Sequence, residues 1–227
     1  MLYAAFSTVT TLMAGYLGFL IPQTWAMGPV WLAYAALTGT LATGCWVVAH
    51  ECGHDAFSEN KFLQDAVGYI LHTALLVPYF SWQRSHAVHH ANCNSIEQGE
   101  THVPKVVSDD YYKFGMRSKI GKTLFGVYMY ATHYLLGWPA YILAGKSGGP
   151  KYGGTNHFWP YAPFNNGEKE LFPGSWKQKV LKSDLGIVAF MGALALWAKA
   201  TSWQTVGLIY GLPYLVVNFW LVCYTWL

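Results

Sequence analysis

Charged residues are scarce in this sequence. Only 11% of its 227 residues are Asp, Glu, Lys or Arg, whereas soluble domains carry about 25%. So low a charge content excludes an ordinary water-soluble domain, and a hydrophobic fraction of 53% excludes intrinsic disorder. The net charge of +3 is too small and too dispersed to indicate a nucleic-acid partner. Four cysteines without any CxxC pair indicate neither a disulfide framework nor a cysteine-based zinc site.

Long stretches have no formal charge at all. Residues 1–49 contain no Asp, Glu, Lys, Arg or His, and further uncharged runs cover 66–83, 123–145, 185–198 and 200–227. About 20 apolar residues cross a bilayer as a helix. The runs therefore predict transmembrane crossings at 2–21, 27–48, 185–203 and 205–227.

The basic residues show which side faces the cytoplasm. All Lys and Arg residues except Lys199 lie in 51–122 and 146–184, and basic loops stay on the cytoplasmic side. If both regions are cytoplasmic, the apolar runs 66–83 and 123–145 do not cross but lie at the membrane surface. We therefore predict a single membrane-embedded domain over 1–227: an all-α integral membrane protein with four crossings, interfacial helices and an irregular loop over 145–175.

Histidines form two groups with helical spacing. His50 and His54 stand four residues apart in HECGH, and His86, His89 and His90 form HAVHH. On a helix, these spacings place each group on one face. Imidazole is a common ligand of transition metals. Because each group follows an apolar run, we predict a histidine-rich metal site at the cytoplasmic membrane surface.

Three kinds of metal site compete for these residues. HECGH matches the zinc protease signature HExxH, with Glu51 as general base, but this interpretation leaves HAVHH without a purpose. A carboxylate di-iron bundle needs two Glu-x-x-His motifs, and only Glu51 with His54 supplies one. A histidine-rich di-iron site uses both groups.

Both groups and their flanks resemble the membrane fatty acid desaturases, in particular the microsomal delta-12 (omega-6) oleate desaturase branch. The matching segments are WVVAHECGHDAFS (46–58), LLVPYFSWQRSHAVHHANCNSIEQGETHVPK (75–105), HFWPYAPF (157–164), SDLGIVAF (183–190) and YGLPYLVVNFWLVCYTWL (210–227). The resemblance runs over nearly the whole chain.

The resemblance implies a cis double bond introduced into an acyl lipid, oleate becoming linoleate, by oxygen-dependent chemistry at two iron ions. It implies electrons from cytochrome b5 and its reductase, and the endoplasmic reticulum membrane in preference to a plastid. The implied iron ligands are His50, His54, His86, His89 and His90. We expect nearby support for the ligands from Glu51, Glu100, His102 and Asn218.

One feature of the family has no match in this sequence. The family's third histidine box, of the form HxxHH, follows the last span, and no second HxxHH occurs here. We therefore expect a partial chain that lacks this box and part of the amino terminus, and that does not hold a competent di-iron centre alone. The alternatives left open are an omega-3 desaturase, a hydroxylase or an acetylenase of the same superfamily, an intramembrane HExxH zinc protease, and a truncated inactive membrane protein.

Other polar residues carry weaker expectations. His72 and His133 lie in apolar runs, where we expect neutral, hydrogen-bonded side chains, and His157 receives no role. Four basic residues are candidates for docking an acidic electron carrier. They are Lys113, Arg117, Lys119 and Lys122.

Overall fold

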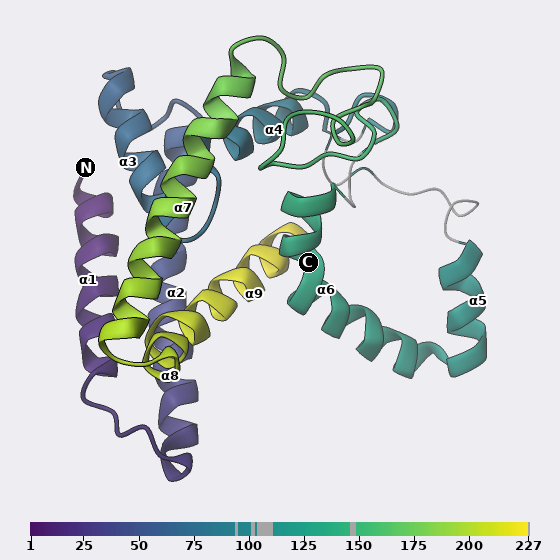
Figure 1. Cartoon of the computed structure of the whole chain (residues 1–227). Coiled ribbons are helices and arrows are strands. Elements are labelled where there is room, and N and C mark those ends of the chain that lie inside the picture. The colour runs from purple at the N-terminus through teal and green to yellow at the C-terminus, as the bar shows by residue number, and fades with distance from the viewer. Residues whose placement is uncertain (94, 101–102, 104–110, 146–148, 227) are drawn as a thin grey trace. The chain divides into compact units, whose positions relative to one another are not determined.

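A computed structural model describes residues 1–93, 95–100, 103, 111–145 and 149–226. The described chain is helical, as the all-α prediction requires, and it divides into two units. The terminal unit comprises Met1–Gln83 and Leu181–Leu227, and the central unit comprises Arg84–Val180 (Figure 1).

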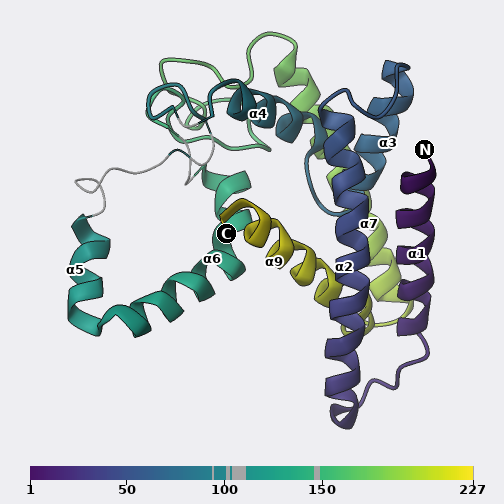
Figure 2. The same cartoon turned by 180° about the vertical axis from the view of Figure 1, so that it is seen from behind.

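Helix α2 (Gly28–Gly53) is the centre of the terminal unit. Its helical neighbours are α1 (Leu2–Gly18), α3 (Lys61–Ala74) and α9 (Leu212–Trp226). Both Figure 1 and Figure 2 show α2 between α1 and α9. Gly39 of α2 allows the approach of α9, because a Cβ atom at this position would lie 2.5 Å from Val216 Cβ and 2.6 Å from the Pro213 carbonyl oxygen. Small residues at such contacts are typical of helices that associate in membranes.

Three helical segments within the described ranges are long and apolar enough to cross a membrane. They are Trp25–Gly53, Trp176–Ala200 and Trp203–Thr225. The first adds the short helix η1 (Trp25–Met27) to α2, the second is α7, and the third joins α8 (Trp203–Val206), the π-helical η3 (Gly207–Gly211) and α9. These segments correspond to three of the four predicted crossings. Helix α1 covers the other one with only 17 residues, so the fourth crossing stays a prediction.

The helices extend beyond the uncharged runs that predicted them. Helix α2 continues to Gly53, past the predicted end at residue 48, and α7 (Trp176–Ala200) begins before the predicted start at 185. Backbone hydrogen bonding does not end where the apolar sequence ends, so a helix can carry charged residues out of the membrane. This extension places the first histidine group in the last turn of α2.

The apolar run 66–83 is not one helix. It divides between α3 and α4 (Tyr79–Ala91), with Leu76 at a φ of 55° and Pro78 just before α4. Proline cannot donate a backbone hydrogen bond and disfavours helical geometry in the preceding residue. The run therefore turns, and α4 carries the second histidine group.

The central unit consists of the rest of α4, helices α5 (Tyr111–Ile120) and α6 (Lys122–Ala144), and an irregular segment that precedes α7. No helix occurs in the described part of this segment, 149–175, as the sequence predicted. The segment is nevertheless well packed. Its apolar side chains join α4 and α7 in one buried core, formed by Val88, Tyr152, Leu171, Phe172 and Val180.

Candidate metal centre

His50 and His54 lie together at the end of α2. Their Nε2 atoms are 3.3 Å apart. The His54 amide still donates to the carbonyls of His50 and Glu51, both at 3.2 Å, and the helix ends because Asp55 adopts a left-handed φ of 62°. A left-handed residue is a common end of an α-helix. The spacing of HECGH thus brings two imidazoles together at a helix terminus.

One side of the His50 ring is occupied by a carboxylate. Glu51 Oε1 lies 2.9 Å from His50 Nδ1, so Nδ1–H donates to the carboxylate. The ring also contacts two indoles, with centroid distances of 5.5 Å to Trp46 and 5.3 Å to Trp82. These contacts restrict how the His50 ring can turn.

The surroundings of His54 favour its neutral form. Burial lowers the pKa of His54 below its ordinary value, and a charge on His50 lowers it further. Glu51 and Asp55 oppose the shift. A neutral imidazole offers a lone pair, which a protonated one does not.

The second histidine group lies in the last turns of α4. His86 Nε2 and His90 Nε2 are 3.1 Å apart. The His89 ring lies 6.1 Å from the His86 ring and 5.5 Å from the His90 ring, measured between centroids. The spacing i, i+3, i+4 therefore gathers all three imidazoles.

The opposite face of α4 is fixed within the central unit. Val88 is buried in the core described above. Arg84 Nε donates to the Leu171 carbonyl at 3.1 Å, and its guanidinium lies 5.9 Å from the Trp176 ring centroid. The histidine-bearing turns are thus attached to the irregular segment and to α7.

His157 joins α4 to α6 through a buried chain of hydrogen bonds. Its Nδ1 lies 3.2 Å from the Ile142 carbonyl oxygen, which can only accept, so Nδ1 carries the proton. Nε2 therefore accepts from the Ser85 hydroxyl at 2.9 Å, and the Ser85 oxygen accepts from the Tyr141 hydroxyl at 2.9 Å. Burial lowers the pKa of His157 to about 4, with weak opposition from the Ile142 carbonyl. Ser85 directly precedes His86, so this chain fixes the start of the second group.

In each histidine group, the distance between the paired Nε2 atoms suits two ligands of one metal ion. Two imidazole nitrogens bound to one metal at about 2.1 Å lie about 3.0 to 3.4 Å apart for ligand angles between octahedral and tetrahedral values. Both measured distances, 3.3 Å and 3.1 Å, fall in this range. Each pair thus has donor chemistry and spacing suited to a transition metal.

The comparison with known protein families identifies the family of this chain. The fatty acid desaturase family model matches residues 24–227. The chain belongs to the fatty acid desaturase family.

Several curated desaturases and a hydroxylase are similar to this desaturase-family chain. It is 40% identical to a delta(12)-fatty-acid desaturase of Arabidopsis thaliana over 198 residues, which are 87% of this chain and 49% of that protein. It is 41% identical to an omega-6 fatty acid desaturase, endoplasmic reticulum, of Brassica juncea over 199 residues, 87% of this chain and 49% of the relative. An oleoyl-12-hydroxylase of Ricinus communis is 42% identical over 200 residues, which are 87% of this chain and 48% of that protein. The chain spans about half the length of these relatives.

The expected supporting residues have different surroundings. Glu51 contacts a ligand candidate directly, whereas Glu100 is fully buried in the central unit and accepts from the Thr155 hydroxyl at 3.4 Å. Asn218 is buried on α9. His102 and the side chain of Lys113 lie outside the described residues. His133 is hydrogen-bonded as predicted, with Nδ1 2.6 Å from the Met129 carbonyl oxygen.

His72 differs from the prediction. The side chain is fully buried on α3, and neither ring nitrogen has a hydrogen-bond partner among the described residues. Burial lowers the pKa of His72 to about 3, a charge on His50 adds to the shift, and the Trp46 backbone opposes it. The lowered pKa agrees with the expected neutral form, whereas no hydrogen bond of ordinary geometry meets either ring nitrogen among the described residues. Its neighbours are aromatic, with the Trp46, Tyr79 and Trp82 rings at 5.5, 5.7 and 5.0 Å.

Sequence inspection missed the residues that orient the imidazoles. Trp46 precedes His50 by four residues, as Trp82 precedes His86, so each group continues a helical i, i+4 row that starts with tryptophan. This repeated spacing was a readable signal. His157 gave no such signal, because its partners Ser85 and Ile142 are distant in the sequence.

Proposed function

We propose that this chain forms the iron-binding part of a membrane acyl-lipid desaturase that converts oleate to linoleate by introducing a delta-12 cis double bond. The observation that carries the proposal is the pairing of imidazole Nε2 atoms in both histidine groups of a desaturase-family chain. The relatives named as delta-12 and omega-6 desaturases favour this bond position.

Two iron ions would be held by His50 and His54 together with His86, His89 and His90. When bound, iron supplies the activation of dioxygen that C–H removal from an unactivated acyl chain requires. The chain's own residues hold these imidazoles in place. Glu51 keeps the proton on His50 Nδ1, which leaves Nε2 for the metal, and the Ser85–His157 chain sets the position of the turn that begins with His86.

The topology we propose has four crossings, in an endoplasmic reticulum membrane. Helix α1 exposes large apolar side chains along its length, including Phe6, Leu12 and Tyr16, which suits a lipid environment. With α1 crossing, the histidine groups and the loop over 145–175 share the cytoplasmic side. The apolar helix α6 then lies at the membrane surface.

Electrons would come from cytochrome b5 and its reductase. Arg117 and Lys119 on α5 and Lys122 at the start of α6 are exposed basic residues that could attract an acidic carrier. Screening by salt weakens such an attraction, so electron transfer should slow as ionic strength rises, and replacing these residues should remove that dependence.

The test uses the natural reading frame that contains these residues, expressed in a yeast that makes no polyunsaturated fatty acids. Linoleate should appear, and the purified protein should contain iron. His89→Ala should abolish linoleate and lower the iron content, because it removes a ligand, while His133→Ala should leave both unchanged. Linoleate from the His89→Ala variant would contradict the proposal, and zinc with loss of activity only in Glu51→Ala would indicate a protease.

A hydroxylase is the second candidate, because the 42% identical Ricinus relative is named an oleoyl-12-hydroxylase. The same fatty acid profile separates the two activities. A hydroxy fatty acid in place of linoleate would assign the chain to the hydroxylases of this family.

A further inference from the structure

The buried face of α3 is polar where an apolar stripe is usual. Its buried residues are Gln64, Gly68 and His72, which follow one another at intervals of four and so share one face. Burying polar groups is unfavourable unless they make hydrogen bonds. This face packs on α2, the helix that ends with the first histidine pair.

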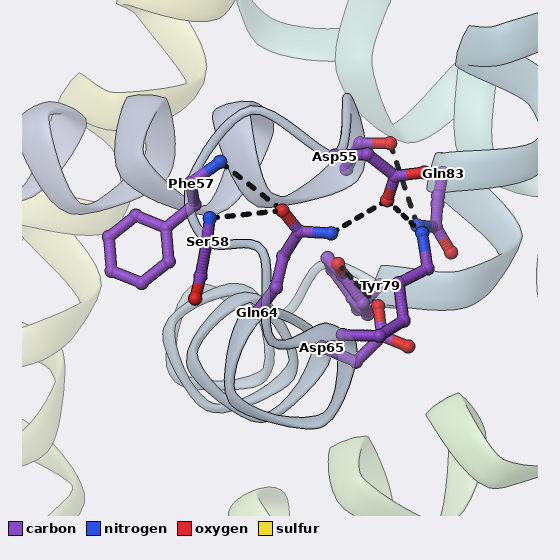
Figure 3. Close-up of polar contacts among 9 residues, drawn as sticks. Asp55, Phe57, Ser58, Gln64, Asp65, Tyr79 and Gln83 are labelled. Carbon is purple, nitrogen blue, oxygen red and sulfur yellow. Dashed lines mark hydrogen bonds and ion pairs between the residues drawn. The ribbon is translucent and has the colours of Figure 1, made fainter.

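Gln64 binds the turn that follows His54. Its side-chain Nε2 donates to Asp55 Oδ1 at 2.6 Å, and its Oε1 accepts from the amides of Phe57 and Ser58 at 3.2 and 3.3 Å (Figure 3). An amide side chain can make four hydrogen bonds. Gln64 uses three of them to bind this one turn. Gln64 is completely buried.

The turn needs this support because its first residue is strained. Asp55 has a left-handed φ of 62°, a conformation that residues other than glycine adopt only occasionally. Its carboxylate is held by Gln64 and also by the Lys61 ammonium group. The Ala56 amide returns to the Glu51 carbonyl at 3.0 Å, so the turn closes onto the HECGH segment.

The other two residues of the α3 face lie against the same part of α2. A Cβ atom at Gly68 would be 2.3 Å from the Tyr79 ring and 2.8 Å from Cys52 Cβ. Glycine at this position therefore allows α3 to approach α2 at Cys52, which lies between His50 and His54 in the sequence. The His72 ring contacts Trp46 and Trp82, and these two indoles also contact His50.

We propose that the buried face of α3 positions the first histidine pair, with Gln64 fixing the end of α2 at His54. Gln64 is a positioning residue, because it acts on the imidazole through the turn at Asp55. The role in iron binding rests on the proposed function, whereas the fixing of the turn does not.

The first experiment compares Gln64→Leu with Gln178→Leu in the purified full-length protein. Gln178 is exposed on α7 and serves as the matched control. Hydrogen exchange of the Phe57 and Ser58 amides should quicken about tenfold in Gln64→Leu, because each loses a hydrogen bond. Iron per chain should fall in the same variant, and neither quantity should change in Gln178→Leu.

The second experiment exchanges donor and acceptor. Gln64→Glu alone places two carboxylates in hydrogen-bond contact and should lower the iron content. Adding Asp55→Asn should restore the iron, because the amide introduced at position 55 donates to the carboxylate introduced at position 64, which still accepts from the two backbone amides. A loss caused only by general unfolding would not be reversed by this pair.

The results separate the two claims. Unchanged amide exchange in Gln64→Leu, unchanged iron despite faster exchange, or no recovery in the double variant would each overturn the positioning role. A wild-type protein without iron and without desaturation would instead remove the proposed function, and the amide exchange would still decide whether Gln64 fixes the turn.

Discussion

At the scale of single residues, the partners of a histidine determine which form it holds. His50 has a carboxylate on Nδ1, His157 has a carbonyl on Nδ1 and a hydroxyl on Nε2, and the buried His72 ring packs against aromatic rings. In His50 the other ring nitrogen, Nε2, lies 3.3 Å from His54 Nε2. In His157 both nitrogens are used, so the residue can hold α4 in place but cannot serve as a ligand without losing a bond.

His157 should make the folded state sensitive to acid. Its pKa is about 4 when folded and about 6.5 when unfolded, so below pH 6.5 the unfolded chain binds a proton that the folded chain does not. Stability from this residue is thus complete above pH 6.5 and lost as pH falls toward 4, amounting to about 2 kcal/mol between pH 7 and pH 5. His157→Gln keeps a neutral donor and acceptor without titrating.

Thermal unfolding in detergent at pH 7 and pH 5 measures this effect. The melting temperature of the wild type should fall more between these pH values than that of His157→Gln, although the variant starts lower because its fit is poorer. Equal falls in both proteins would show that His157 is not the titrating group.

At the scale of helices, the sequence predicted what depends on local pattern. Apolar runs located α2, α7 and α9, and the spacing of HAVHH placed three imidazoles together on α4. The bend at Leu76 that separates α3 from α4, and the continuation of α2 to Gly53, were not predicted, since charge and hydropathy do not report backbone turns. Gln64 was missed because its contacts depend on how α3 packs.

The contact between α2 and α9 should depend on Gly39. Gly39→Ala adds a methyl group within 2.6 Å of a backbone carbonyl on α9, so the helices must separate, and overpacking of this kind costs about 1 to 3 kcal/mol. The melting temperature should fall by about 2 to 4 °C for each kcal/mol.

Gly192→Ala on α7 is the matched control for this substitution. No atom lies within 4 Å of the added methyl group, and alanine favours a helix over glycine by about 1 kcal/mol. The control should therefore be neutral or stabilising. A Gly39→Ala protein that melts no lower than Gly192→Ala would show that α2 and α9 do not pack this closely.

At the scale of the whole molecule, topology depends on whether α1 crosses the membrane. Its 17 residues span about 25 Å, somewhat less than the hydrocarbon thickness of about 30 Å. Thinning of the bilayer or a few further residues can close such a gap. If α1 crosses, residue 3 lies on the side of the loop over 145–175; if it does not, residue 3 lies with the turn before α2.

Single cysteines at three exposed positions distinguish these topologies. In sealed microsomes from a background in which Cys93 and Cys223 are Ser, an impermeant maleimide should label Tyr3→Cys and Glu168→Cys from outside, the cytoplasmic side. Thr24→Cys should be labelled only after the membrane is opened, because the turn after α1 then faces the lumen. Protection of Tyr3→Cys together with Thr24→Cys would reduce the crossings to three, with α1 on the luminal surface. The cytoplasmic position proposed for the histidine groups holds in either case, since α2 and α7 still bring the chain between them to one side.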